Sequence, residues 1–327
     1  MKIRVPEYFS DFRCIADKCL DSCCIGWEIS IDGKTKRKYA SLDNEIGREI
    51  AEKTKHGYFP LEKDERCAFL DESGLCRIIS SVGDEYLCDI CREHPRYYGV
   101  SSYGIEGGIG LSCEAAARII LALDRQPGII ETERELSYDD VDEFAEISEH
   151  FRNHLLNSVF SLDTAGAVEL FTVCAKIADD VAFDASTSGD VIDLPKINTA
   201  CIDEIATEKA YEDFFSLLDK CEALTDDWNK IVAKAKNVYN VESLKRISIN
   251  KGLLYYFTHR YVREGVEDMS LGQRVLFALL SSLAITAISH VIKCDEPLMR
   301  AAVMYSKNIE YSTDNVDMLL DELSVFL

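Results

Sequence analysis

Apolar residues after residue 110 recur every three to four positions, the spacing of amphipathic helices. Ser112 precedes Glu114 and the apolar run Ala115–Leu123, so we predict Ser112 as the N-cap of a helix. The same spacing continues to the end of the sequence. Further helices are predicted over residues 139–160, 164–183, 200–222, 226–239, 242–264, 271–292, 295–307 and 314–326. Between them, Asp184–Pro195 has the composition of a loop or linker.

Residues 1–110 show a different pattern, in which short apolar runs alternate with turn signals. We predict strands at Trp27–Ile31 and Arg77–Ile79 and one helix at Lys34–Lys55. Turn dipeptides lie at Asp32-Gly33, Ser73-Gly74 and Gly107-Gly108. The predicted fold class is therefore mainly α: an irregular cysteine-rich, metal-binding module (residues 1–120) packed on an all-α helical domain (residues 121–327).

One predicted helix is long and apolar enough to raise the question of a membrane span. The stretch Val275–Ile292 has no Asp, Glu, Lys or Arg, but it contains three serines, a threonine and His290. A buried core helix accounts better for this composition. The N-terminal residues lack the apolar run of a secretion signal. We therefore expect a cytoplasmic protein with no membrane partner.

Acidic residues dominate the charge of the chain. The formal net charge is −22, of which −4 lies in residues 1–120 and −18 in the rest. Such a surface repels phosphate backbones, which argues against a nucleic-acid partner. It attracts a cationic partner such as a lysine-bearing protein segment, although acidic residues that only keep the protein soluble explain the same composition.

Cysteines are the most informative residues of the N-terminal part. The chain has 13 cysteines. Nine of them precede residue 114, in three groups: Cys14, Cys19, Cys23 and Cys24; Cys67 and Cys76; Cys88, Cys91 and Cys113. Clustered reduced cysteines indicate metal or redox chemistry. The other four stand apart from one another in the helical part of the sequence and are interpreted as small hydrophobic residues: Cys174, Cys201, Cys221 and Cys294.

The spacing favours an iron–sulfur cluster over zinc. A structural zinc site normally uses two closely spaced cysteine pairs, and only Cys88 and Cys91 have the two-residue spacing. A cluster is larger and accepts wider spacings. Nine cysteines also exceed the needs of one site, which leaves a second site or a reactive thiol. Cys113 stands at a predicted helix start, where the helix dipole favours its thiolate.

Four segments of the chain resemble the flagellin lysine-N-methylase family. They are VPEYFSDFRCIADKCLDSCCIGWEI, RCAFLDESGLCRI, LCDICREHPRYY and GIGLSCEAAARII. The cysteine part is similar to the wider zinc- or iron-chelating family named for its CxxCxxCC motif, through Cys67-Ala68-Phe69-Leu70, Cys76-Arg77-Ile78 and Cys91-Arg92-Glu93-His94-Pro95. The first cysteine group departs from that motif in its spacing, and the CxxxCxxC triplet of radical S-adenosylmethionine enzymes is absent from the chain.

The resemblance implies an enzyme that methylates the ε-amine of lysines on flagellin or a related protein. It also implies a cysteine-bound [4Fe-4S] cluster, with zinc as the alternative, and S-adenosylmethionine as the methyl donor. Arg92 and Arg96 could clamp the donor carboxylate or could neutralise the thiolates. The sequence does not select a general base among the nearby candidates Tyr97, Tyr98, Tyr103, Glu93 and Glu106. His94 could be a metal ligand or could orient one.

Two other classes of function also fit the residues. A metal could replace a missing core in residues 1–120, so that the chain acts as a metal-stabilised interaction module without catalysis. Alternatively, Cys88 and Cys91 could cycle between dithiol and disulfide in a redox or metal-handling protein.

Overall fold

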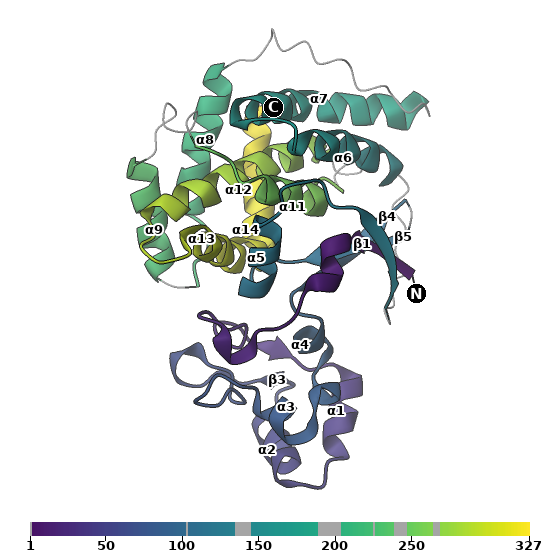
Figure 1. Cartoon of the computed structure of the whole chain (residues 1–327), viewed down its shortest axis with the longest axis vertical. Coiled ribbons are helices and arrows are strands. Elements are labelled where there is room, and N and C mark those ends of the chain that lie inside the picture. The colour runs from purple at the N-terminus through teal and green to yellow at the C-terminus, as the bar shows by residue number, and fades with distance from the viewer. Residues whose placement is uncertain are drawn as a thin grey trace. The chain divides into compact units, whose positions relative to one another are not determined.

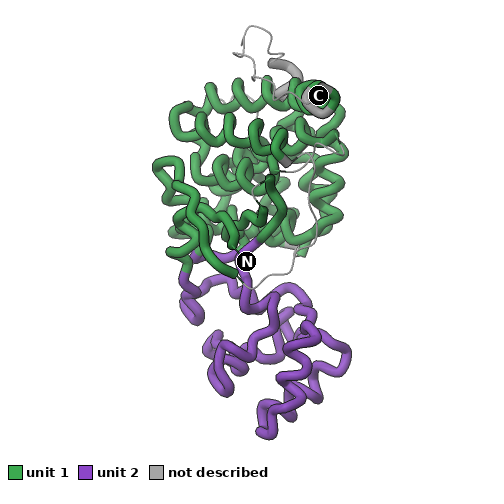
Figure 2. Tube along the Cα trace, turned by 90° about the vertical axis from the view of Figure 1, so that its right-hand side faces the viewer, with its two compact units in different colours: residues 1–12, 98–112, 116–327 green, residues 13–97, 113–115 purple. Residues whose placement is uncertain are grey.

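The computed structural model describes residues 2–102, 104–134, 145–188, 204–224, 226–238, 247–263 and 269–327. The chain is mainly helical (Figure 1) and divides into two compact units (Figure 2). The first, called the cysteine unit here, comprises residues 13–97 and 113–115. The second, called the helical unit, comprises residues 1–12, 98–112 and 116–327.

The cysteine unit is built from short elements. They are the 3-10 helix η2 (Ala16–Lys18), β2 (Ile29–Ser30), α1 (Gly33–Ala40), α2 (Glu45–Lys53), β3 (Tyr58–Phe59), η3 (Lys63–Glu65), α3 (Arg77–Val82), η4 (Asp84–Tyr86) and α4 (Asp89–Glu93). Strands β2 and β3 pair antiparallel, with Ile29 opposite Phe59. A compact apolar core that includes Ile50, Phe69 and Cys88 holds these elements together.

Side-chain caps explain where the first two helices begin. The Asp32 carboxylate accepts the Thr35 N–H at 2.8 Å at the start of α1, and the Asn44 side chain accepts the Gly47 N–H at 2.9 Å at the start of α2. The single helix predicted for 34–55 is therefore two helices. Each cap satisfies an amide that helical bonding leaves without a partner.

The strand predicted at Arg77–Ile79 is wrong, because these residues begin α3. Cys76 occupies the N-cap position of this helix, and Gly83 ends it at a φ of 101° that glycine adopts without strain. The predicted strand at Trp27–Ile31 exists only as the two residues of β2.

The helical unit contains most of the long elements. They are β1 (Lys2–Pro6), η1 (Glu7–Asp11), β5 (Gly104–Ile109), α5 (Glu114–Leu121), β6 (Ile129–Glu133), α6 (Ala145–Val159), α7 (Thr164–Ser188), α8 (Glu204–Leu218), α9 (Asp226–Val238), α11 (Lys251–Tyr261), α12 (Leu271–Val291), α13 (Pro297–Tyr305), the π-helix η6 (Ser306–Glu310), α14 (Thr313–Leu323) and η7 (Ser324–Phe326). Strand β4 (Arg96–Ser101) begins in the cysteine unit and ends in the helical unit, and the first two residues of α5 belong to the cysteine unit.

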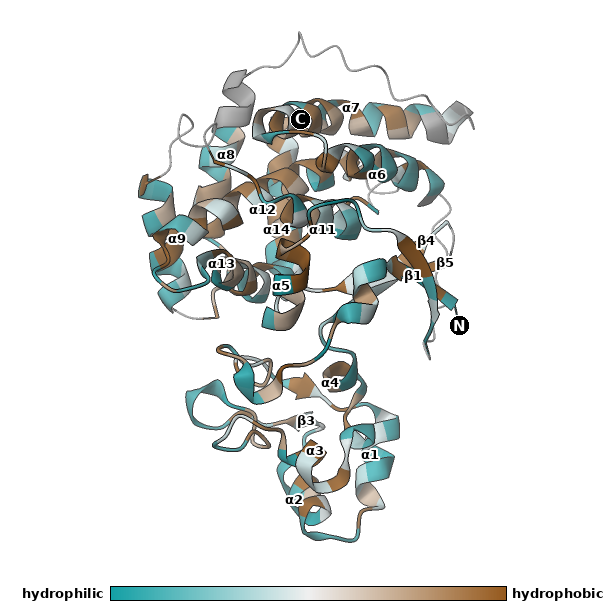
Figure 3. Ribbon diagram, in the orientation of Figure 1, coloured by the Kyte–Doolittle hydropathy of each residue, from teal (hydrophilic) through white to brown (hydrophobic). Residues whose placement is uncertain are grey.

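A four-stranded sheet, in the order β4-β5-β1-β6, corrects the expectation of an all-α body. Strand β1 pairs in parallel with β5, and antiparallel with β6, where Pro6 is opposite Ile129. The glycine pair predicted as a turn, Gly107-Gly108, lies inside β5. These pairings join residues about a hundred positions apart, which periodicity within one segment cannot reveal. Figure 3 shows hydrophobic (brown) and hydrophilic (teal) residues side by side in these strands.

The helix predictions after residue 140 are confirmed to within nine residues at each described end, and three helices begin at the predicted residue. Helix α7 is longer than predicted and covers the first five residues of the expected loop Asp184–Pro195, whose remainder lies outside the described residues. Helix α5 begins at Glu114, so Cys113, not Ser112, directly precedes it. The division into domains at residue 120 stays a prediction. In the structure, residues 2–12 and 98–112 contribute strands to the helical unit.

Helix α12 forms the centre of the helical unit. It packs against α7, α11 and α13, and nearly all of its side chains are buried, including Val275 and Ile288. Among the described helices it alone is long and apolar enough to cross a membrane, but 83% of its apolar window is buried inside the protein. This burial confirms the expected core helix.

Candidate metal centre

Four cysteines gather in the core of the cysteine unit. Cys88 is fully buried in that core, and Cys67, Cys76 and Cys91 pack against it half-buried. We call these four residues the core quartet. They come from two places in the sequence: the segment 67–76, and the start of α4.

Local backbone structure positions each member of the core quartet. Between Cys67 and Cys76 the chain reverses, with Leu70 bridged to Cys76 and the Arg77 N–H donating to the Phe69 carbonyl at 2.8 Å. Cys76 and Cys88 occupy the N-cap positions of α3 and α4. Both sulfur atoms therefore lie where backbone N–H groups lack helical partners.

Backbone amides donate hydrogen bonds to the sulfur atoms. The Phe69 N–H bonds to Cys67, those of Ile78 and Ile79 bond to Cys76, and those of Ile90 and Cys91 bond to Cys88. In each case the donor lies two or three residues after the cysteine. Such N–H groups stabilise negative charge on sulfur and tune thiolate ligands of metals.

The thiols of the core quartet influence one another strongly. Burial raises the pKa of Cys67 to about 11, and burial also raises that of Cys76. The Cys91 thiol donates to the Cys88 sulfur; this bond and burial raise the pKa of Cys91, whereas the same bond lowers that of Cys88. Several buried thiolates close together repel one another, so they either keep their protons or need a cation.

A second group of thiols lies beside the first. Cys23 is hydrogen-bonded through its side chain to Cys24, and it lies within electrostatic range of Cys14 and Cys113. Cys24 also lies within electrostatic range of three core-quartet thiols, and its carbonyl accepts the Cys67 N–H at 2.8 Å. The structure thus brings together eight of the nine predicted cysteines, with Cys24 between the two groups.

Cys19 ends η2, where its N–H donates to the Ala16 carbonyl. It is half-buried, whereas Cys14 is exposed. Cys113 directly precedes α5, one residue from the predicted start of this helix. Next to it, the Glu114 carboxylate accepts the Asp21 N–H at 2.6 Å, which links the segment 113–115 to the first cysteine group.

The donor chemistry of the core quartet fits a metal or an iron–sulfur cluster. Within the described ranges, no three His, Cys, Asp or Glu side chains already have the arrangement of a metal site. The four sulfurs nevertheless share one core, accept backbone N–H bonds and come from separate turns of chain. Binding a metal would replace their protons and draw the sulfurs closer together.

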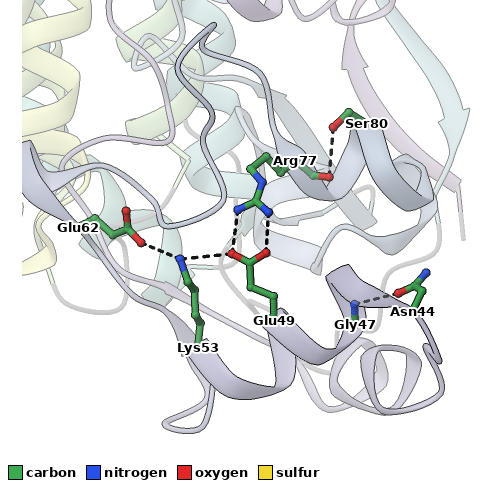
Figure 4. A network of polar contacts seen from close by, with 7 residues as sticks. All are labelled: Asn44, Gly47, Glu49, Lys53, Glu62, Arg77 and Ser80. Atoms are coloured by element: carbon green, nitrogen blue, oxygen red, sulfur yellow. Dashed lines mark hydrogen bonds and ion pairs between the residues drawn. The ribbon is translucent and has the colours of Figure 1, made fainter.

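Two acidic residues that the sequence did not single out anchor the core quartet. Asp32 caps α1, and its second carboxylate oxygen accepts the Asp89 N–H at 3.0 Å, one residue after Cys88. Glu49 on α2 binds both terminal nitrogens of Arg77 at 2.8 and 2.6 Å, one residue after Cys76 (Figure 4). The Asp32-Gly33 turn signal could have indicated the first. For the second, the sequence carries no local signal.

The same network extends along α2. The Lys53 ammonium lies 3.4 Å from Glu49 and 2.8 Å from Glu62, and the Ser80 hydroxyl donates to the Arg77 carbonyl at 3.2 Å (Figure 4). Helices α2 and α3 are therefore tied together beside Cys76.

The two arginines proposed for donor binding lie close to the core quartet in sequence. Arg92 forms ion pairs with Asp89 and Glu93, two carboxylates of its own helix. Arg96 donates to the Arg92 carbonyl at 3.5 Å. These contacts favour local charge neutralisation, and donor binding by Arg92 and Arg96 stays a prediction.

The remaining candidates are divided between the units. Glu93, His94 and Tyr97 belong to the cysteine unit, where the His94 ring packs against Trp27 with ring centres 6.3 Å apart. Tyr98 and Glu106 belong to the helical unit. Tyr103 lies outside the described residues. No arrangement among these residues selects a general base.

The scattered cysteines behave mostly as predicted. Cys174 and Cys221 are buried, and burial raises the pKa of each thiol to about 12. Cys294 is exposed between α12 and α13, so its interpretation as a packed hydrophobic residue was wrong. Cys201 lies outside the described residues.

Known proteins resemble part of this chain. It is 28% identical over 129 residues to the flagellar biosynthetic protein FliU of Salmonella muenchen, covering 35% of this chain and 75% of that protein. It is also 28% identical over 126 residues to lysine-N-methylases of Salmonella choleraesuis and Salmonella typhimurium, covering 35% of this chain. The resemblance to lysine-N-methylases is confirmed over about a third of the chain.

The chain spans 31% of the length of either lysine-N-methylase. No family model matches it, and no solved structure does.

Proposed function

We propose that this chain is a protein lysine N-methyltransferase that uses S-adenosylmethionine and a cysteine-ligated [4Fe-4S] cluster to methylate flagellin or a related protein. The observation that carries the proposal is the sequence similarity to two lysine-N-methylases. The assembled thiols of the cysteine unit support it, because they supply the ligands that such a cluster requires.

The core quartet is the proposed ligand set. When bound, the cluster would supply iron that can act as a Lewis acid or exchange an electron. The backbone amides after each cysteine stabilise the thiolates, and Asp32 and Glu49 hold the two helices on which Cys88 and Cys76 begin.

The acidic character of the chain suits a lysine-bearing substrate. A lysine ε-amine has a reference pKa of about 10.4, so its proton must be removed before the nitrogen attacks a methyl group. With a net charge of −22, the protein attracts such cationic segments over a distance set by the salt concentration.

Metal analysis is the first test. Protein purified without oxygen is expected to contain about four irons and four sulfides per chain and to absorb visible light. The variant Cys91→Ser should lose this metal, because it removes one ligand of a buried set. Cys174→Ala is the control: it removes a buried thiol outside the site and should keep the metal.

Methyl transfer is the second test. Flagellin is incubated with the protein and labelled S-adenosylmethionine, and mono-, di- and trimethyl-lysine are measured by mass spectrometry. Label on flagellin lysines, lost in Cys91→Ser but not in Cys174→Ala, would support the proposal. Stoichiometric zinc without sulfide and without methyl transfer would instead favour a metal-stabilised interaction module. A metal-free protein that cycles between dithiol and disulfide would favour a redox role.

A further inference from the structure

A small cavity of about 60 Å³ lies within the helical unit, and no cysteine lines it. It is enclosed by residues of the sheet and of helices α6 and α11. Arg4 of β1, Glu106 of β5, Arg152 of α6, and Tyr255 and His259 of α11 are among the residues that line it.

The sheet and α6 bring opposite charges together at this cavity. Arg4 and Glu106 are register partners on the parallel strands β1 and β5, and their side chains are 3.5 Å apart. Arg152 forms a 2.7 Å ion pair with the same carboxylate. The side chains of Arg152 and Glu106 are only 4% and 5% exposed. Two guanidinium groups therefore lie against one buried carboxylate.

Part of the buried Arg152 guanidinium is left unsatisfied. Its Nε has no hydrogen-bond partner within the part of the chain that the structure describes, and its Nη1 reaches the His259 carbonyl only at 3.5 Å. Burial and the nearby Arg152 and Arg263 lower the pKa of His259, so the imidazole is neutral at pH 7. A buried guanidinium with an unused donor is costly unless an acceptor binds it.

We propose that this cavity binds a carboxylate group of a small molecule through Arg152 and Arg4. A guanidinium presents two parallel N–H donors that match the planar carboxylate. The volume corresponds to roughly two water molecules, which suits a carboxylate and its adjoining carbon but not a nucleoside. Gln126 and Ile129 also line the cavity and are exposed, so the rest of the ligand can extend past them into solvent.

This carboxylate site is inferred independently of the proposed methyltransferase function, but it could bind the methyl donor of that reaction. The amino-acid end of S-adenosylmethionine is one source of such a carboxylate, and a free small carboxylate is another. Titration calorimetry of the full chain with acetate, methionine and S-adenosylhomocysteine separates these sources. Methioninol, which replaces the carboxylate of methionine by an alcohol, is the matched negative probe, and chloride keeps the ionic strength constant.

Two variants should move the affinity in opposite directions. Arg4→Gln removes one cation from the half-exposed rim and should weaken carboxylate binding about tenfold, the usual loss for one charge-assisted hydrogen bond. Glu106→Gln removes the carboxylate that competes for both arginines and should strengthen binding about tenfold. Arg118→Gln, which breaks a surface ion pair with Glu296, should leave it unchanged.

Binding of acetate by the wild-type protein, with these opposite changes, would support the proposal and indicate a free carboxylate as the source. Binding of methionine and S-adenosylhomocysteine without acetate would support it and indicate the methyl donor. Equal binding of methioninol and methionine, or no carboxylate binding by wild type and Glu106→Gln alike, would overturn it and leave water as the occupant. Absence of lysine methylation would refute the proposed function but would not change any of these titrations.

Discussion

Asp32 should control the local stability of the two helices that it joins. One carboxylate oxygen accepts the Thr35 N–H at 2.8 Å and the other accepts the Asp89 N–H at 3.0 Å. Burial opposes ionisation of this carboxyl, but these backbone donors outweigh it and lower its pKa from 3.8 to about 2. A shift of that size corresponds to about 2.5 kcal/mol, and the partial exposure of the side chain reduces the expected value to roughly 1 to 2 kcal/mol.

Two substitutions separate the two contacts. Asn at position 32 keeps an oxygen that can cap α1 but presents an amide to the Asp89 N–H, so Asp32→Asn should lose only the second bond. Asp32→Ala should lose both. The expected measurement is amide hydrogen exchange, because a loss of about 1.4 kcal/mol in local stability accelerates exchange about tenfold. In Asp32→Asn this acceleration should appear at Asp89 and not at Thr35. In Asp32→Ala it should appear at both.

The pH of the experiment follows from the sign of the pKa shift. Because the folded pKa is lowered, the stabilisation is fully present above the unfolded value near 4 and is lost as the pH falls toward 2. Exchange at neutral pH therefore measures the full effect. Asp43→Asn, at an exposed aspartate of the same unit, is the control. Unchanged exchange at Asp89 in Asp32→Asn would refute this account of how α4 is anchored.

Two further substitutions test contacts in each unit. Glu49→Gln removes the bidentate ion pair with Arg77. Because Arg77 is partly exposed, this variant should lower the free energy of unfolding of the cysteine unit, measured in urea, by roughly 0.5 to 1 kcal/mol. An equal loss in Glu52→Gln, at an exposed glutamate of the same helix, would contradict a specific role for Glu49. Gly252→Ala would place a Cβ against the Ile120 carbonyl oxygen, so it should destabilise the helical unit by about 3 kcal/mol. If the variant unfolds at the same urea concentration as the wild type, α5 and α11 are not packed this closely.

Local patterns predicted the helices of the second half well. Helices α12 and α14 repeat apolar residues over their whole length, and burial on one side or on all sides follows from that repeat. The break between α1 and α2 was missed, although Asn44 is a common capping residue. Here the apolar spacing continued across the capped turn and concealed it.

Long-range pairings could not be predicted from such patterns. Strand β5 contains three glycines and looks like a turn, and only its pairing with β1 makes it a strand. The same holds for the site. The spacing predicts that Cys88 and Cys91 bind a metal, but which distant thiols lie beside them depends on the hairpin that ends at Cys76. Glu106 was considered as a base, whereas its partners Arg4 and Arg152 became apparent only in three dimensions.

The order of the two units along the chain has a consequence for assembly. Strand β1 leads into the cysteine unit, and the chain leaves that unit through β4 to reach β5, the parallel neighbour of β1. While the cysteine unit is unfolded, pairing β1, which ends at Pro6, with β5, which begins at Gly104, must close a flexible loop of roughly 97 residues. A loop shortened by metal loading to the equivalent of about ten residues would cost roughly 2 kcal/mol less to close. If the cysteine unit binds a metal as proposed, metal supply would promote completion of the sheet through chain entropy alone.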